Sequence, residues 1–162
     1  MKARLAGIAC LVALVAGVAW QWHADNADAR AHTLTALDPD AVRHIEVDLR
    51  GLPPERFERS GDRWTIAGAP ADEGRAGEFA SLAATPVASW REVSEFDAAK
   101  IGLSPPVAVL VLDDVRLEFG EMTALGKQRY VKAGDRIAIV PAQALPRAPR
   151  TASLPTTAAG AP

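Results

Sequence analysis

The segment Val107-Ala-Val-Leu-Val-Leu-Asp-Asp-Val-Arg-Leu-Glu-Phe-Gly120 decides the fold that this sequence predicts. Its first part, residues 107–112, is continuously apolar, which is typical of a strand buried on both faces. The pair Asp113-Asp114 supplies turn chemistry, and apolar and charged side chains then alternate from Val115 to Phe119. The segment therefore predicts a β-hairpin whose first strand is deeply buried.

Further strands are predicted on both sides of this hairpin from alternating or β-branched patterns, at residues 45–49, 56–59, 63–66, 89–93, 128–132 and 136–140. The one main helix is predicted at residues 71–85, which Pro86 ends. Short helical turns are expected at 38–40, with Asp38 as N-cap, and at 96–101. Antiparallel hairpins packed with one main helix indicate an α+β domain, preceded here by an N-terminal transmembrane or signal helix.

The N-terminal leader is a pair of basic residues followed by an apolar run. Lys2 and Arg4 precede residues 5–20, a stretch of 16 residues without a charged side chain. The basic residues are expected to hold the N-terminus in the cytoplasm. The rest of the chain is then predicted to lie outside the inner membrane, in the periplasm.

Two fates of the leader remain open at this point. Trp20 and Trp22 favour an uncleaved, single-pass anchor, because indole rings are favoured at the level of the lipid headgroups. The small residues Gly17-Val18-Ala19 instead favour cleavage before Trp20, which would release a soluble periplasmic protein. Cys10 lies within the run and is interpreted as a small hydrophobic residue of the leader.

Composition divides the chain into a leader, a linker, a domain and a tail. Residues 1–22 are the signal anchor or signal peptide, and residues 23–34 are expected to form a stalk rich in Ala and Asp. Residues 35–146 are the predicted α+β domain, and residues 147–162, rich in Pro, Ala and Thr, are expected to be a disordered tail.

The charge balance and the single cysteine exclude some classes of protein. Subtracting Lys2 and Arg4 from 18 basic residues leaves 16, against 20 acidic residues. With no basic stripe, nucleic acid is not an expected partner. Because the one cysteine is in the leader, the exported part has no intrachain disulfide.

Short motifs follow one another in a specific order along the domain: Asp38–Val42, Trp64–Ile66, Ile101–Pro106, Leu117–Gly120, Tyr130-Val131, Gly134 and Ile139-Val140. This order resembles bacterial domain-of-unknown-function family 4340, present as one short copy over residues 35–146. Ile101 replaces the aromatic residue that is usual in the family before Gly-Leu. The resemblance implies a membrane-anchored domain, which in some members stands beside ABC-transporter parts. It assigns no catalytic residue.

The sharpest cluster of polar residues is His44, Glu46 and Asp48, which the two-residue period of a strand places on one face. A histidine with two carboxylates has the ligand types for a divalent metal, but a solvated strand face has the same composition. Asp113-Asp114 is interpreted as turn chemistry. No nucleophile elbow and no phosphate-binding glycine loop occurs, so no catalytic residue and no cofactor is predicted.

These observations predict a non-catalytic periplasmic domain held at the membrane by its N-terminal helix, with another envelope protein as partner. It would serve as an interaction or accessory module of an envelope or transport complex. The alternative is a module that binds a small ligand or a metal through the face carrying His44.

Overall fold

A computed structural model describes residues 32–149, so the predicted leader and most of the stalk and tail lie outside the described residues. In the described part, no helix has the length and apolar character needed to span a membrane. Contacts of the domain extend slightly beyond residues 35–146. The backbone nitrogen of Leu34 donates to the carbonyl of Thr85 (2.8 Å), and Arg147 forms an ion pair with Glu78 (3.2 Å).

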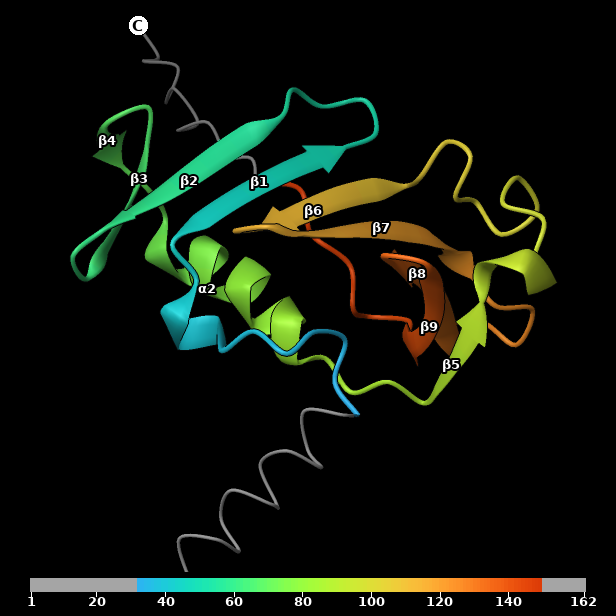
Figure 1. The fold of residues 1–162 in the computed structure, drawn as a ribbon. Coiled ribbons are helices and arrows are strands. Elements are labelled where there is room, and N and C mark those ends of the chain that lie inside the picture. Colours follow the sequence, from blue (N-terminus) through green and yellow to red (C-terminus); the bar gives the residue numbers. More distant parts are fainter. Residues whose placement is uncertain (1–31, 150–162) are drawn as a thin grey trace, which may run out of the picture.

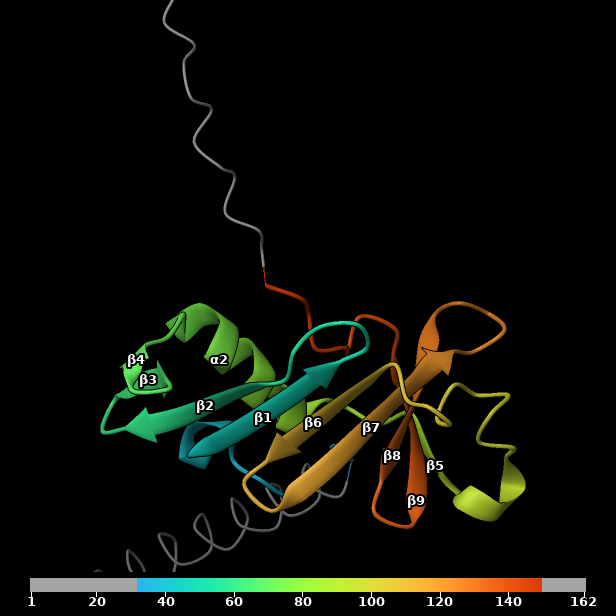
Figure 2. The same ribbon diagram turned by 90° about the horizontal axis from the view of Figure 1, so that it is seen from above.

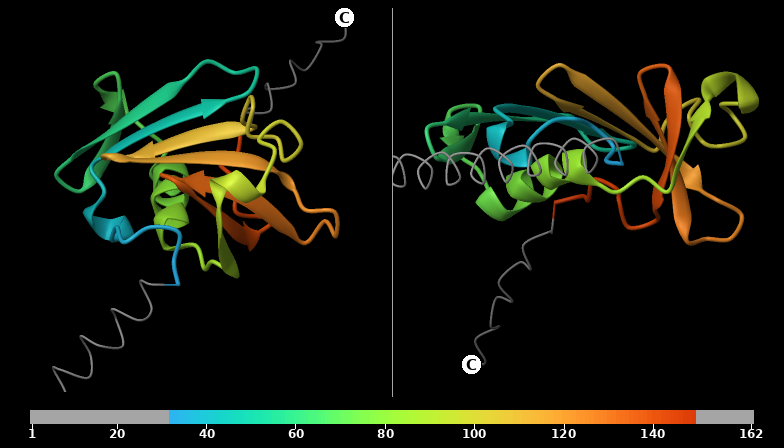
Figure 3. Two further views of the ribbon diagram at one scale, coloured as in Figure 1. Left: turned by 45° about the vertical axis from the view of Figure 1, so that its right-hand side comes forward. Right: turned by 60° about the horizontal axis from the view of Figure 1, so that its bottom comes forward.

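The described chain forms one antiparallel sheet of nine strands, in the order β4-β3-β2-β1-β6-β7-β8-β9-β5 (Figure 1). The strand bounds are β1 His44–Leu49, β2 Glu55–Ser60, β3 Arg63–Ile66, β4 Ala69–Pro70, β5 Ser89–Glu92, β6 Ala108–Leu112, β7 Val115–Met122, β8 Gln128–Ala133 and β9 Arg136–Pro141. The predicted strands are therefore present, and the short strand β4 is an addition. The sheet twists strongly, so that β8 and β9 turn away from the plane of β1 and β2 (Figure 3).

The main helix of the described part, α2 (Glu73–Ser81), lies against one face of the sheet. Its N-cap is Asp72, whose carboxylate accepts from the backbone nitrogen of Arg75 (3.1 Å). The last predicted turn is instead a 3-10 helix, η2 (Leu82–Ala84). The helix is thus shorter than the predicted 71–85, but its predicted apolar face is confirmed, since Ala76 and Phe79 are fully buried.

The space between α2 and the sheet is the main hydrophobic core. Phe57 of β2 and Phe79 of α2 meet edge to face, with ring centroids 5.7 Å apart. The inward residues of β1, β6 and β7 complete this core, namely Ile45, Val47, Leu110, Leu112, Leu117 and Phe119. The apolar residues of the alternating patterns at 45–49 and 115–119 therefore face the core beneath α2.

A second, smaller core lies on the opposite face, over β8 and β9. Ile101 and Leu103, from the connection between β5 and β6, pack against Ile137. Phe96 meets Tyr130 edge to face at 5.5 Å. The 3-10 helix of this connection, η3 (Val93–Glu95), begins before the predicted turn at 96–101, where the backbone nitrogen of Ile101 donates to the carbonyl of Asp97 (3.3 Å).

The expectation that residues 107–112 are buried on both faces is confirmed for most of β6, since four of its five residues are buried, among them the outward-facing Val109. Within the described part of the chain, α2 covers only the inner side of β6, and Val111 on the outer side is half-buried (Figure 2). The continuous apolar run predicts burial on both faces, and no described layer is needed on the outer side for Val109 to be buried. In this fold the outward valines are covered only by the side chains of neighbouring strands.

Candidate protein-docking surface

The outer face of β2, β1, β6, β7 and β8 is the candidate functional surface. Figure 2 looks onto β2, β1, β6 and β7, and no described helix crosses these four strands on this side. Because side chains alternate along a strand, this face carries the residues between the inward ones. They are His44, Glu46 and Asp48 of β1, Arg56 and Glu58 of β2, Val109 and Val111 of β6, Arg116 and Glu118 of β7, and Lys132 of β8, and we call them the outer face.

Strand register arranges the outer face in rows that cross the sheet. In the first row Arg56, Glu46, Val111 and Arg116 stand opposite one another in turn. Arg56 Nη2 lies 3.2 Å from Glu46 Oε1. Opposite charges on adjacent strands stabilise the pairing of those strands.

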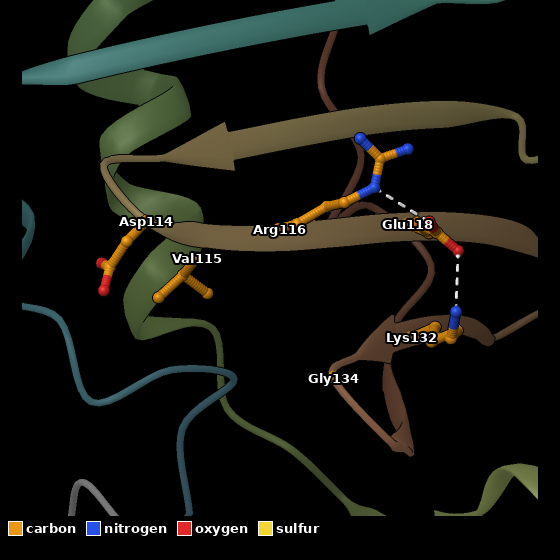
Figure 4. A pocket seen from close by; sticks show the side chains of 6 residues that line it. All are labelled: Asp114, Val115, Arg116, Glu118, Lys132 and Gly134. Carbon is orange, nitrogen blue, oxygen red and sulfur yellow. Dashed lines mark hydrogen bonds and ion pairs between the residues drawn. The ribbon is translucent and has the colours of Figure 1, made fainter.

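In the second row Asp48, Val109, Glu118 and Lys132 are opposite one another in turn. Figure 4 shows Glu118 between two cations, with Arg116 Nε at 3.0 Å and Lys132 Nζ at 3.3 Å from its carboxylate oxygens. These residues line a shallow hollow of about 380 Å³ together with Asp114, Val115 and Gly134. The four charged groups of the hollow balance, so it offers no net charge to a small ion.

Glu118 stays ionised in this position although its environment opposes charge. Partial burial raises the pKa of its carboxyl, but the hydrogen bonds and positive charges of Arg116 and Lys132 outweigh burial, and the pKa lies below its usual value. The cluster is therefore a fixed pattern of charges at neutral pH rather than a group that exchanges a proton.

The predicted candidates His44, Glu46 and Asp48 do share one face of β1, but each has a separate environment. His44 Nδ1 lies 3.5 Å from Asp113 Oδ1, and Glu46 pairs with Arg56. Asp48 stands opposite Val109, which is not a ligand. Over residues 32–149 the structure brings together no group of three or more His, Cys, Asp or Glu side chains able to hold a metal ion.

The predicted turn at Asp113-Asp114 is present, and its first residue ties the hairpin to β1. Asp113 has φ +51°, a left-handed conformation that aspartate tolerates better than most residues. Its Oδ1 accepts hydrogen bonds from the backbone nitrogens of Arg43 (3.1 Å) and His44 (2.9 Å). This carboxylate is therefore occupied by the backbone.

The sequence did not point to the cluster of Arg116, Glu118 and Lys132. Alternation along 115–119 placed the first two on an outward face, but Lys132 comes from a hairpin that the sequence could not align with β7. The missing information was the register, in which Glu118 stands opposite Lys132. The one available signal was an outward Glu118 two residues after Arg116 on the same strand.

No family model matches the chain, and no curated protein or solved structure matches it either. The resemblance to family 4340 thus stays a prediction from the order of its motifs.

Proposed function

We propose that this chain is a membrane-tethered, non-catalytic periplasmic domain that binds another envelope protein through the outer face. The arrangement of charged and apolar side chains on the outer face is the observation that supports this proposal most. Opposite charges stand in rows around Val109 and Val111, and in the described residues no helix covers them. Val109 is buried and Val111 is half-buried, and an apolar centre with a charged surround has the general anatomy of a protein interface.

The arrangement favours a protein partner over a small ligand. A small-molecule site is usually a concave, mostly apolar pocket. The hollow beside Glu118 is shallow, and its charges are already paired with one another. A row of alternating charges selects a partner whose own charges have the complementary order, because like charges brought opposite one another are strongly unfavourable.

The first experiment tests the tether. A C-terminally tagged full-length protein is fractionated, and the intact mass of the product is measured. The full-length mass in the membrane fraction supports the anchor. A soluble product that begins at Trp20 would support the cleaved alternative instead.

The second experiment tests the docking surface. The tagged protein is purified from chemically cross-linked membranes, and recovered proteins are compared with those of the variant Arg116→Glu, Lys132→Glu. We expect the variant to lose a specific partner at least about tenfold, because both cations next to Glu118 become repulsive. The matched control is Lys100→Glu, an exposed charge that lies near the opposite end of β7. Equal recovery by both variants, or no partner above background, would contradict the proposal.

A further inference from the structure

The hairpin loop between β7 and β8 presents an apolar side chain to solvent. Leu125 is 85% exposed and Met122 is 54% exposed, and they are two of the three exposed large hydrophobic residues in the described part of the chain. The loop is tightly closed, since the backbone nitrogen of Thr123 donates to the carbonyl of Gln128 and that of Gly126 to the carbonyl of Thr123, both at 2.8 Å. Leu125 is therefore held outward by a defined turn.

This loop shares a hollow with the turn before β5, and that turn is hydrogen-bonded to the first described residue. Leu125 and Lys127 line one hollow of about 540 Å³ together with Pro86, Val87 and Pro141. The backbone nitrogen of Val87 donates to the carbonyl of His32 (2.8 Å), the first described residue.

The length of the linker limits how far residue 32 lies from the bilayer. Residues 23–31 join the predicted anchor to His32, and nine residues reach at most roughly 30 Å even when fully extended. The proposed tether therefore keeps residue 32 within that reach of the bilayer, and the turn bonded to residue 32 shares its hollow with Leu125. Its neighbour Lys127 is a cation that suits anionic headgroups, and a lysine stem also tolerates apolar surroundings.

We infer that Leu125, at the tip of the β7–β8 hairpin, inserts into the interfacial layer of the membrane as a second contact beside the N-terminal anchor. This inference rests on the proposed tether. A single protruding leucine on a tight turn suits a fluid lipid layer, whereas a stable protein interface needs a much larger area. Two contacts would fix the orientation of the domain and leave the outer face of β1 and β2 on the side away from the bilayer.

The test uses the full-length protein with Cys10→Ser, reconstituted in vesicles of phosphatidylethanolamine and phosphatidylglycerol. Leu125→Cys carries an environment-sensitive fluorophore, and quenching by spin-labelled lipid is compared with quenching by aqueous iodide. The matched control is Leu52→Cys, which is 42% exposed in the loop between β1 and β2. We expect lipid quenching at least about threefold stronger at position 125 than at position 52, and weaker iodide quenching.

The outcomes separate this inference from the proposed tether. If the protein floats with the vesicles and both positions respond equally to iodide, the hairpin contact is wrong and the tether stands. Shielding of position 125 from both quenchers, in a protein that runs as a dimer, would assign the loop to a second copy and overturn the inference. A protein that does not float with the vesicles would overturn the tether and this inference together.

Discussion

Gly120 lies directly against the carbonyl oxygen of Ile101, so closely that a Cβ atom at position 120 would be only 2.4 Å from that oxygen. The same carbonyl accepts a hydrogen bond from the backbone nitrogen of Glu121 (2.8 Å). Gly102 faces this contact from the other side, with φ +70° and Glu121 nitrogen at 2.9 Å from its would-be Cβ. The irregular register of β7 and β8 between Phe119 and Met122 falls at this point.

This contact explains two of the sequence motifs in physical terms. Ile101–Pro106 and Leu117–Gly120 are far apart in the chain, yet their glycines meet where the β5–β6 connection crosses β7. Each glycine is needed because backbone occupies the space that a side chain would take. The contact joins the β5–β6 connection, which carries part of the second core, to β7.

We predict that Gly120→Ala destabilises the fold by about 2 kcal/mol or more, because Cβ would push the Ile101 carbonyl away and strain the bulge. Urea unfolding of the purified protein measures this. The matched control is Gly77→Ala on the exposed side of α2, where nothing lies within 4 Å of the added atom. Alanine is the better helix former, so this variant should gain about 0.5–1 kcal/mol. Equal stability of the two variants would contradict the proposed close approach.

A second prediction concerns Arg75, whose side chain is only 13% exposed. It pairs with Glu55, and its guanidinium lies 4.8 Å from the ring centroid of Phe79. Arg75→Met should cost about 1–3 kcal/mol, because Glu55 keeps a partly buried charge without its partner. A double-mutant cycle with Glu55→Gln, measured by urea unfolding, should give a coupling of about 1–2 kcal/mol.

The matched control for Arg75 is the exposed pair of Arg56 and Glu46 on the outer face, where the arginine side chain is 76% exposed. The same cycle on that pair should give less than about 0.5 kcal/mol. If the exposed pair were as strongly coupled as the buried one, burial would not be the reason for the strength of the Arg75 contact.

A third prediction follows from the lowered pKa of Glu118. Because its pKa in the folded chain lies below that in the unfolded chain, the ionised carboxylate stabilises the fold at pH values above about 4.3. This stabilisation is lost as the pH falls through the lower, folded-state pKa. Unfolding measured from pH 7 to pH 3 should therefore show a loss of stability in the acid range that is smaller in Glu118→Gln.

The cations beside Glu118 provide the control for this pH dependence. In Lys132→Met the carboxylate loses one hydrogen bond and one positive charge, so its pKa should rise. An NMR titration of the Glu118 side chain measures this directly. An unchanged titration in the variant would show that Lys132 does not hold the carboxylate in its ionised form.

A fourth prediction concerns the turn between β6 and β7. Asp113→Ala should destabilise the protein by about 1–3 kcal/mol, since it removes the acceptor for two backbone nitrogens and places alanine at positive φ. Asp113→Asn keeps an acceptor oxygen and tolerates that φ, so it should lie much closer to wild type. The exposed neighbour supplies the comparison, because Asp114→Ala should change stability by less than about 0.5 kcal/mol. If Asp114→Ala lowered stability as much as Asp113→Ala, the role of Asp113 as the acceptor for these two backbone nitrogens would be contradicted.

Local patterns in the sequence predicted most of the strands and which way their residues face. The alternation at 45–49 and 115–119 places Ile45 and Leu117 inward, because a strand half covered by a helix needs that order. The helix centre is equally local, since Ala76 and Phe79 recur at helical spacing. Hairpins joined by two-residue turns also define their own register.

The order of the strands could not be predicted in the same way. Pairing of β1 with β6 and of β5 with β9 joins segments far apart in the chain, and the sequence carries no local signal for such contacts. The same limit applies to predicting the candidate surface from the sequence. The alternation places His44, Glu46 and Asp48 on one face, but their neighbours Asp113, Arg56 and Val109 come from distant parts of the chain, and no local pattern predicts which residues become neighbours.

The most direct test of the central claim is photo-cross-linking from the middle of the outer face. Full-length protein carrying benzoylphenylalanine at position 111, between Glu46 and Arg116 in its row, is irradiated in intact cells, and adducts are identified by mass spectrometry. We predict one dominant adduct with an envelope protein, which weakens at least about tenfold when Arg116→Glu and Lys132→Glu are added. A membrane-bound protein that gives no adduct at position 111, or gives the same adduct regardless of these charges, would contradict the claim that this face binds a partner.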